Sequence, residues 1–331
     1  MDALAAPWPA AVAVSGGADS LALMHLLARW AGARALPAPV VLTVDHGLLP
    51  DSAAMARKVI GWAREAGLKA VPLAWKGRKP EADIEAAARE ARYRLMGDWL
   101  RANGLDALYV AHTEDDQAET FLLRLARGSG LDGLSAMQEV APFPLRSAGA
   151  LRLVRPLLSF SRGTLRGHLA DQRQSWIEDP MNVDPRFARA RIRAAWPALE
   201  ALGLVRARIA DAAAHMSRAR EALDWATLAV ARRAVWLEDD VAAVDSEALV
   251  QAPREVALRL LARLLMVVGG QSYRPRFENL ERLFDSIVDG AFKAATLHGC
   301  IVAAAPRAKA VFGSATILIR PEAKRRLKRS S

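Results

Sequence analysis

The chain has 331 residues, enough for about two domains, and its 52% hydrophobic and 25% charged residues are typical of a globular protein. The formal net charge of +10 favours a polyanionic partner such as nucleic acid, although a GC-rich genome that encodes many Ala and Arg residues would also produce it. The single cysteine, Cys300, excludes an internal disulfide framework, a Cys-x-x-Cys redox pair and a multi-cysteine metal site.

Four predicted strands alternate with four predicted helices along the first part of the chain. The strands are expected at 11–14, 39–45, 69–75 and 105–112, and the helices at 19–31, 52–67, 81–104 and 113–130. This alternation predicts an α/β domain with a parallel sheet and helices on both faces. Ligands bind beyond the carboxyl ends of the strands in such sheets. Pro72 restricts the third strand to an edge or an end, because proline cannot donate to a central ladder.

The pattern changes after about residue 130 and becomes mostly helical. We expect a Gly- and Pro-rich loop at 130–149, a short strand at 151–158, a helix opened by Ser161, and a turn that becomes an arginine-rich helix within 177–200. Further helices are expected at 204–235 and, as a pair, at 253–289, followed by a β-hairpin from 296–305 and 309–320. The N-terminus has no basic leader pattern, and no apolar run approaches the roughly 20 residues that cross a bilayer. We therefore expect a cytoplasmic protein without a membrane partner.

The loop "SGGADS" joins the first strand to the first helix and has the composition of an anion-binding turn. It consists of Ser15, Gly16, Gly17, Ala18, Asp19 and Ser20. Two glycines let several backbone N–H groups point at a ligand, and a helix N-terminus favours an anion. The loop has no lysine of the kind that serves terminal phosphate transfer. Asp19 would repel a bare phosphate, so it is either a helix cap or a partner of Mg²⁺ beside a pyrophosphate. A tight turn without a ligand is the alternative.

The loop resembles the SGGxDS signature of the PP-loop ATP pyrophosphatases. In that superfamily the loop holds the pyrophosphate end of ATP, and AMP is transferred to the substrate. The resemblance implies ATP as a substrate with Mg²⁺, ATP binding by the six loop residues, and a role for Asp19 in catalysis and as a metal ligand.

Four further stretches resemble the tRNA(Ile)-lysidine synthetase family. They are "TVDHGL" (43–48), "AREARY" (88–93), "AHTEDDQAETFLLRLARGSGLDGL" (111–134) and "EDPMNVDPRFARARIR" (178–193). The last has Ala190 where the family pattern usually has Asn. The implied reaction adenylates the wobble cytidine of an isoleucine tRNA with a CAU anticodon. The amine of free L-lysine then displaces AMP and forms lysidine.

The acidic start of the fourth helix suits a lysine substrate. Asp116 and Glu119 are separated by three residues, so they share a helical face. They could hold the lysine ammonium, and one of them could take a proton from the amine. Asp115 lies about 100° around the helix and is expected to serve a metal or the structure. An acidic first turn favoured by the helix dipole is the alternative.

Other polar residues follow the strand ends or lie on the third helix. His112 could orient a phosphate or donate to the leaving group, or it could be a satisfied loop histidine. Asp45 and His46 close the second strand where the ribose or adenine of ATP should lie, although the backbone alone could make those contacts. Arg89 and Arg92 share a helical face and could neutralise the α-phosphate, unless they are solvated. The predicted catalytic set is Asp19, Arg92, His112, Asp116 and Glu119.

The predicted tRNA contacts are arginines. They are Arg127, Arg186, Arg189, Arg191 and Arg193, of which Arg186, Arg189 and Arg193 fall on one helical stripe. Such side chains suit tRNA phosphates, although Arg127 could equally cap its helix. Phe187 and Trp196 could stack on a base or belong to the core.

We therefore expect a catalytic PP-loop domain at 1–195, a mainly helical tRNA-binding domain at 196–320 and a basic tail without fixed structure at 321–331. A homodimer is also compatible with the sequence. One alternative function is a PP-loop tRNA thiolase, which the lone Cys300 disfavours. Another is a non-catalytic basic RNA-binding protein.

Overall fold

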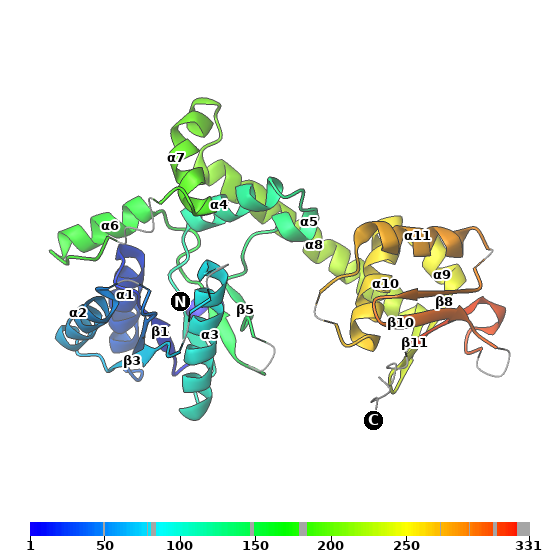
Figure 1. Cartoon of the computed structure of the whole chain (residues 1–331), viewed down its shortest axis with the longest axis horizontal. Coiled ribbons are helices and arrows are strands. Elements are labelled where there is room, and N and C mark those ends of the chain that lie inside the picture. The colour runs from blue at the N-terminus through cyan, green and yellow to red at the C-terminus, as the bar shows by residue number, and fades with distance from the viewer. Residues whose placement is uncertain are drawn as a thin grey trace, which may run out of the picture. The chain divides into compact units, whose positions relative to one another are not determined.

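The computed structural model describes residues 1–48, 50–77, 79–80, 84–145, 149–178, 184–271, 273–290, 292–306 and 310–322. The chain forms two compact units, Met1–Ser217 and Arg218–Ser331 (Figure 1). The division falls within α8 (Arg206–Ala234), whereas the boundary expected at 195/196 lies inside α7 (Ala188–Ala201). The predicted basic tail lies outside the described residues from position 323 onward.

The first unit contains a six-stranded sheet in the order β3-β2-β1-β4-β6-β5. The strands are β1 (Ala11–Ala13), β2 (Val40–Asp45), β3 (Ala70–Ala74), β4 (Ala107–Tyr109), β5 (Val140–Pro142) and β6 (Arg152–Val154). All neighbours are parallel except β5 and β6, which are antiparallel. The alternating helices are α1 (Ala18–Ala33), α2 (Ser52–Glu65), α3 (Ile84–Ala102) and α4 (Glu114–Leu125). The predicted α/β architecture is therefore confirmed.

Helices cover both faces of this sheet, as Figure 1 shows for α1 and α2 on one side and α3 on the other. One core packs α1 and α2 with α6 (Arg162–Asp171), and Leu21, Leu27 and Leu165 are buried in it. The opposite core contains Met96 and Leu100 of α3. These two residues are four positions apart, so one stripe of α3 faces the sheet. Burying a leucine side chain such as Leu100 stabilises the folded state by about 1.5–3 kcal/mol.

The sheet edges agree only partly with the sequence. Pro72 lies in β3, which is an edge strand, as its missing N–H requires. The expected loop at 130–149 instead contains α5 (Leu131–Leu134) and β5. β5 is three residues long and ends at Pro142, so its turn-like composition hid a strand.

The second unit contains a five-stranded antiparallel sheet in the order β7-β8-β11-β10-β9. Its strands are β7 (Val235–Glu238), β8 (Val241–Asp245), β9 (Ala294–Leu297), β10 (Cys300–Ala304) and β11 (Thr316–Pro321). The predicted hairpin is the β10–β11 pair, which the other strands extend. The helices are α9 (Ser246–Gln251), α10 (Arg254–Val268) and α11 (Phe277–Val288), which pack with Cys300 in a separate core. Among the described residues, no helix is long and apolar enough to span a bilayer.

Candidate active site

The loop at residues 15–20 is held in shape by its own hydrogen bonds. The backbone N–H of Ser15 donates to Ser20 Oγ at 3.2 Å, and Ser20 Oγ donates to the carbonyl of Gly17 at 2.9 Å. Gly16 has φ +93°, and a Cβ there would lie 2.7 Å from Cδ1 of Ile177. This position therefore requires glycine, because a side chain would be both strained and obstructed.

The first helix begins within this segment, at Ala18. The N-cap of α1 is Gly17, and no side chain caps the helix. Asp19 lies in the first turn rather than at the cap, so the capping role considered for it from the sequence does not apply. The N-terminus of α1 therefore meets the site without a side-chain cap, which suits an anion.

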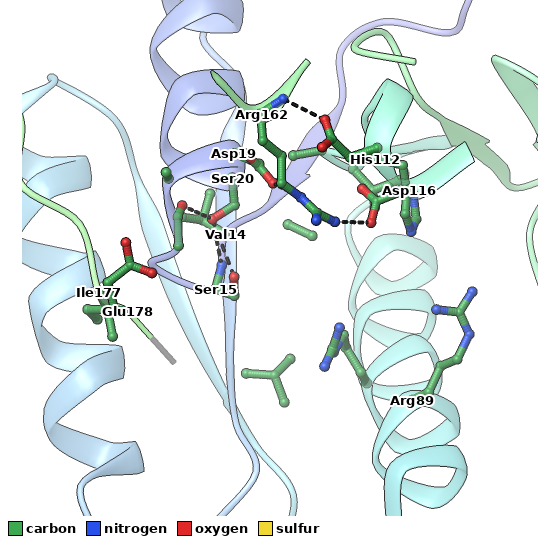
Figure 2. Close-up of a pocket in the computed structure, with 18 of the residues that line it drawn as sticks. Val14, Ser15, Asp19, Ser20, Arg89, His112, Asp116, Arg162, Ile177 and Glu178 are labelled. Atoms are coloured by element: carbon green, nitrogen blue, oxygen red, sulfur yellow. Dashed lines mark hydrogen bonds and ion pairs between the residues drawn. The ribbon is translucent and has the colours of Figure 1, made fainter. Parts of the chain in front are cut away.

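A cavity of about 880 Å³ opens at the carboxyl ends of the parallel strands (Figure 2). Its lining combines the loop with residues of several other elements. They include Ser15, Gly17, Ala18, Asp19, Ser20, His46, Arg89, Arg92, His112, Asp115, Asp116, Arg162, Arg193 and Arg206. The chain thus brings most of the predicted catalytic and ATP-binding residues to one cavity.

Asp116 is fixed by the start of α4. Its Oδ2 accepts from the backbone N–H of Thr113 at 2.9 Å, and Thr113 Oγ1 accepts from the N–H of Asp116 at 3.4 Å, which completes a capping box. Burial raises the pKa of Asp116, but the guanidinium groups of Arg162 and Arg189 outweigh it and lower the pKa below its ordinary value. Asp116 is therefore a buried, ionised carboxylate.

Three arginines converge on the predicted lysine-binding carboxylates. Arg162 lies 2.6 Å from Asp116 Oδ1 and 2.7 Å from Glu119 Oε1. Arg189 lies 3.2 Å from Asp116, and Arg193 lies 2.7 Å from Glu119. Figure 2 shows Arg162 reaching toward Asp116 with Asp19 beside it. Arg162 is also 3.3 Å from Asp19, so one guanidinium connects the loop to α4.

Asp115 serves the structure, one of the two roles expected for it. Its Oδ2 accepts from the backbone N–H of Arg162 at 2.8 Å, and its Oδ1 pairs with Arg206 at 3.0 Å. Arg206 in turn lies over the ring of Trp196 at 4.2 Å. Trp196 is 2% exposed and belongs to a small core, so of its two possible roles it is a core residue.

The two histidines of the site have different surroundings. Burial lowers the pKa of His112 well below its ordinary value of 6.5, so its imidazole is neutral. Its Nδ1 is buried and has no hydrogen-bond partner among the described residues. His46 contacts Arg92 at 3.4 Å and packs edge-on against Trp75.

Asp45 is placed away from the cavity lining. Its carboxylate accepts from the backbone N–H of Gly47 at 2.9 Å. Hydrogen bonds from Ser52 and Gly47 lower its pKa. The side chain is thus engaged in the turn between β2 and α2, which leaves backbone contacts as the form an ATP-binding role for Asp45 would take.

The five predicted tRNA arginines divide into two groups. Arg127, Arg186 and Arg191 are exposed, whereas Arg189 and Arg193 point to the site carboxylates. Arg186 pairs with Asp184, and Arg191 donates to the carbonyl oxygens of Pro185 and Arg186. The remaining part of the "EDPMNVD" stretch, residues 179–183, lies outside the described residues.

Sequence reasoning missed Arg162 and Arg206. Arg162 is the first residue of α6, and Ser161 caps this helix by accepting from the N–H of Thr164. The helix start was predicted, but its arginine is 43 and 46 residues away from its partners Glu119 and Asp116. No local pattern reports such a distant contact. The only available signal was the parallel sheet, which gathers segments after different strands at one edge.

The loop, the sheet order and the cavity define a nucleotide-binding protein of the PP-loop class, and residues 7–199 match the PP-loop domain family. A solved structure of similar fold is the U34-tRNA thiolase NcsA from Methanococcus maripaludis. It has a TM-score of 0.51 and 15% identity, and the match covers 63% of this chain and 72% of that one, a likeness of fold alone.

Curated relatives identify the particular family within the PP-loop class. The tRNA(Ile)-lysidine synthase of Methylobacterium nodulans is 43% identical over 88% of this chain and 86% of the relative. That of Ruegeria pomeroyi is 40% identical over 88% of this chain and 68% of the relative, and that of Wolbachia pipientis wMel is 39% identical over 88% and 67%. The chain belongs to the tRNA(Ile)-lysidine synthase family.

Proposed function

We propose that this protein joins lysine to the wobble cytidine of an isoleucine tRNA with a CAU anticodon, using ATP and releasing AMP and pyrophosphate. Family membership supports ATP and tRNA(Ile) as substrates. One structural observation supports the proposed reaction chemistry. The loop at residues 15–20 and the Asp116–Glu119 pair are joined through Arg162 at one site.

The loop and α3 supply the ATP half of the reaction. Backbone N–H groups at the start of α1 and the hydroxyls of Ser15 and Ser20 would hold the pyrophosphate of ATP. Arg89 and Arg92 line the cavity and would stabilise charge that develops at the α-phosphate. The cytosine carbonyl oxygen attacks this phosphorus, the bond to the pyrophosphate oxygen breaks, and the tRNA carries AMP.

The residues present fit a magnesium ion that arrives with ATP. Among the described residues, no group of three metal-ligating side chains occurs. Mg²⁺ bound to nucleotides needs only one or two carboxylates, because phosphates and water complete its shell. Asp19 lines the cavity at the first turn of α1, where it would hold the ion. The bound ion would supply neutralisation of the phosphate charge. Burial raises the pKa of Asp19 to about 6 despite Arg162, so a nearby cation would favour its ionised form.

The lysine half of the reaction is assigned to α4. Asp116 and Glu119 are 6% and 2% exposed, so a cation held between them is shielded from water. Glu119 would accept a proton as the amine attacks C2 of the adenylated cytosine. The bond from C2 to the AMP oxygen then breaks, and AMP leaves. Neutral His112 can donate a hydrogen bond to the phosphate without carrying charge.

The exposed arginines and the second unit are assigned to tRNA. Arg127, Arg186 and Arg191 are available for phosphate contacts, which give affinity rather than sequence specificity. The helical domain proposed at 196–320 would hold the rest of the tRNA, and the net charge of +10 supports a polyanionic partner.

A labelling experiment tests the proposed function. The protein is incubated with ATP, radiolabelled lysine and isoleucine tRNA with a CAU anticodon, and methionine tRNA with the same anticodon is the control substrate. We expect lysine label in the isoleucine tRNA, dependent on ATP, and AMP in equal amount. The absence of label with active pyrophosphate release on another substrate would overturn the proposal. Asp19→Ala should abolish AMP transfer to the tRNA.

A further inference from the structure

The carboxylates assigned to lysine already hold cations of the protein itself. Asp116 contacts Arg162 and Arg189, and Glu119 contacts Arg162 and Arg193. A lysine ammonium that approaches this pair therefore meets guanidinium groups where it would bind. Lysine recognition must include the departure of one of these cations.

Three carboxylates of this site and the three guanidinium groups that contact them carry equal and opposite charge before any substrate binds. Among the described residues, the carboxylates of Asp19, Asp116 and Glu119 face the guanidinium groups of three arginines. They are Arg162, Arg189 and Arg193. Removing one guanidinium leaves one net negative charge. A lysine ammonium restores the balance, whereas a neutral ligand leaves a poorly solvated charge without compensation.

Arg162 is the guanidinium that lies between the two carboxylates, since one of its terminal nitrogens contacts Asp116 and the other contacts Glu119. Arg193 grips both oxygens of Glu119, at 2.7 and 3.2 Å, and Arg189 bonds both Asp116 and Thr120. Asp116 is also held by the capping box of α4. Both carboxylates would therefore keep their places without Arg162. Arg162 gives each of them a single nitrogen and has a third carboxylate, Asp19, at 3.3 Å.

We propose that Arg162 is a displaceable occupant of the lysine site, whose guanidinium leaves these carboxylates when the side-chain ammonium of lysine binds Asp116 and Glu119. The inference rests on the proposed function. Arg162 is a positioning residue that sets the threshold for binding. Only a ligand that brings a side-chain ammonium can replace it, so amino acids of similar length with an uncharged side chain leave the site closed.

Direct lysine binding to the whole protein tests this competition. Titration calorimetry with lysine compares the wild type with Arg162→Met, which keeps the bulk of the side chain and removes its charge. Because the site no longer has to be vacated, we expect the dissociation constant for lysine to fall roughly tenfold. The matched control is Arg254→Met, which removes another arginine that bridges two carboxylates, Asp285 and Glu281, in the second unit. This control should bind lysine as the wild type does. Weaker lysine binding by Arg162→Met would overturn the proposal.

Added methylguanidinium shows whether Arg162 competes with lysine or holds the carboxylates in place, because it should change the dissociation constant for lysine in opposite directions in the two cases. In Arg162→Ala, added methylguanidinium should refill the vacated place and raise the apparent dissociation constant for lysine. If Arg162 instead organises the carboxylates, methylguanidinium would restore binding that the variant had lost, and the proposal would be wrong. Circular dichroism and thermal melting check the fold, and Arg162→Gln, which keeps polar contacts, is used if Ala or Met does not fold.

Measurements on the wild type distinguish a failure of the proposed function from a failure of the role proposed for Arg162. If the wild type neither binds lysine nor labels tRNA, the proposed function fails. If the wild type does both but Arg162→Met binds lysine less tightly, only the role of Arg162 fails.

Discussion

Asp116 shows how one side chain at this site serves both the fold and the chemistry. Its Oδ2 accepts from the backbone and hydroxyl of Thr113, and its Oδ1 faces Arg162 and Arg189. A substitution there would change the start of α4 together with the charge balance of the site. Glu119 has no part in the capping box, so it is the better probe of lysine chemistry.

Glu119→Gln should separate the two half-reactions. The amide keeps the size of the side chain but accepts no proton from the amine. We expect lysine transfer from adenylated tRNA to slow by about 10²-fold or more, while adenylation changes only a few-fold. Single-turnover assays that follow AMP on the tRNA and lysine in the tRNA measure the two steps. Equal losses in both steps would show that the role assigned to Glu119 is wrong.

The buried imidazole of His112 should make stability depend on pH. Because burial lowers its pKa in the folded state below 6.5, the unfolded chain binds one more proton at acidic pH. The stabilisation is complete above pH 6.5 and declines below it, by up to about 1.4 kcal/mol for each pH unit. Urea unfolding at pH 7.5 and 5.5 should show this loss in the wild type and a smaller one in His112→Gln. His215→Gln, at an exposed position, is the control and should retain the wild-type pH dependence.

At the scale of elements, α7 has two faces with different tasks. Arg189 and Arg193 are four residues apart, so they share the face that meets Asp116 and Glu119. Arg191 lies between them on the exposed face. The helix therefore contributes arginines to the lysine site on one side and offers a cation to solvent on the other.

Alanine substitutions on the two faces of α7 should affect different ligands: one should affect tRNA binding and the other lysine binding. Arg191→Ala should weaken tRNA binding and reduce the slope of log K against log salt by about 1, because one phosphate contact is lost. Its lysine affinity should be unchanged. Arg193→Ala should change lysine binding instead, since Glu119 loses its bidentate partner. Filter binding at several salt concentrations and lysine calorimetry provide the comparison. A reduced salt slope for Arg193→Ala alone would reverse the assignment.

The same elements show what the sequence could and could not predict. Gly16 and Gly17 after a short apolar run predicted the loop, and Ser161 predicted the start of α6, because caps and turns are local. The short strands β7 and β8 were missed, since β7 follows α8 without a break and the turn at Asp239-Asp240 is short. The inward direction of Arg189 and Arg193 was also missed. Helical spacing shows which residues share a face, but the element that this face meets is decided by distant packing.

At the scale of the whole molecule, each unit has its own hydrophobic core. The first contains the two cores on the faces of the sheet and a small cluster around Trp196. The core of the second unit contains residues of 230–319. The residues assigned to ATP and lysine belong to the first unit alone.

Calorimetric unfolding should therefore show two transitions, only one of which responds to ATP. ATP with Mg²⁺ at 100 times its dissociation constant should stabilise the first unit by about 2.7 kcal/mol. The transition of the second unit should stay in place. Asp19→Ala is the control, because it removes the proposed metal ligand and should reduce the shift. A single transition that moves as a whole with ATP would show that the two units unfold together.

Pro72 has a consequence for how copies of this protein behave when they are crowded. It lies in the middle of the edge strand β3, where Trp75 donates inward to Asp45 of β2. Residues at odd positions of β3 thus direct their N–H groups into the sheet, and position 72 faces outward. The open edge lacks a donor at its centre, which discourages a strand of another molecule from extending the sheet. We therefore expect the proline to disfavour edge-to-edge aggregation at high concentration.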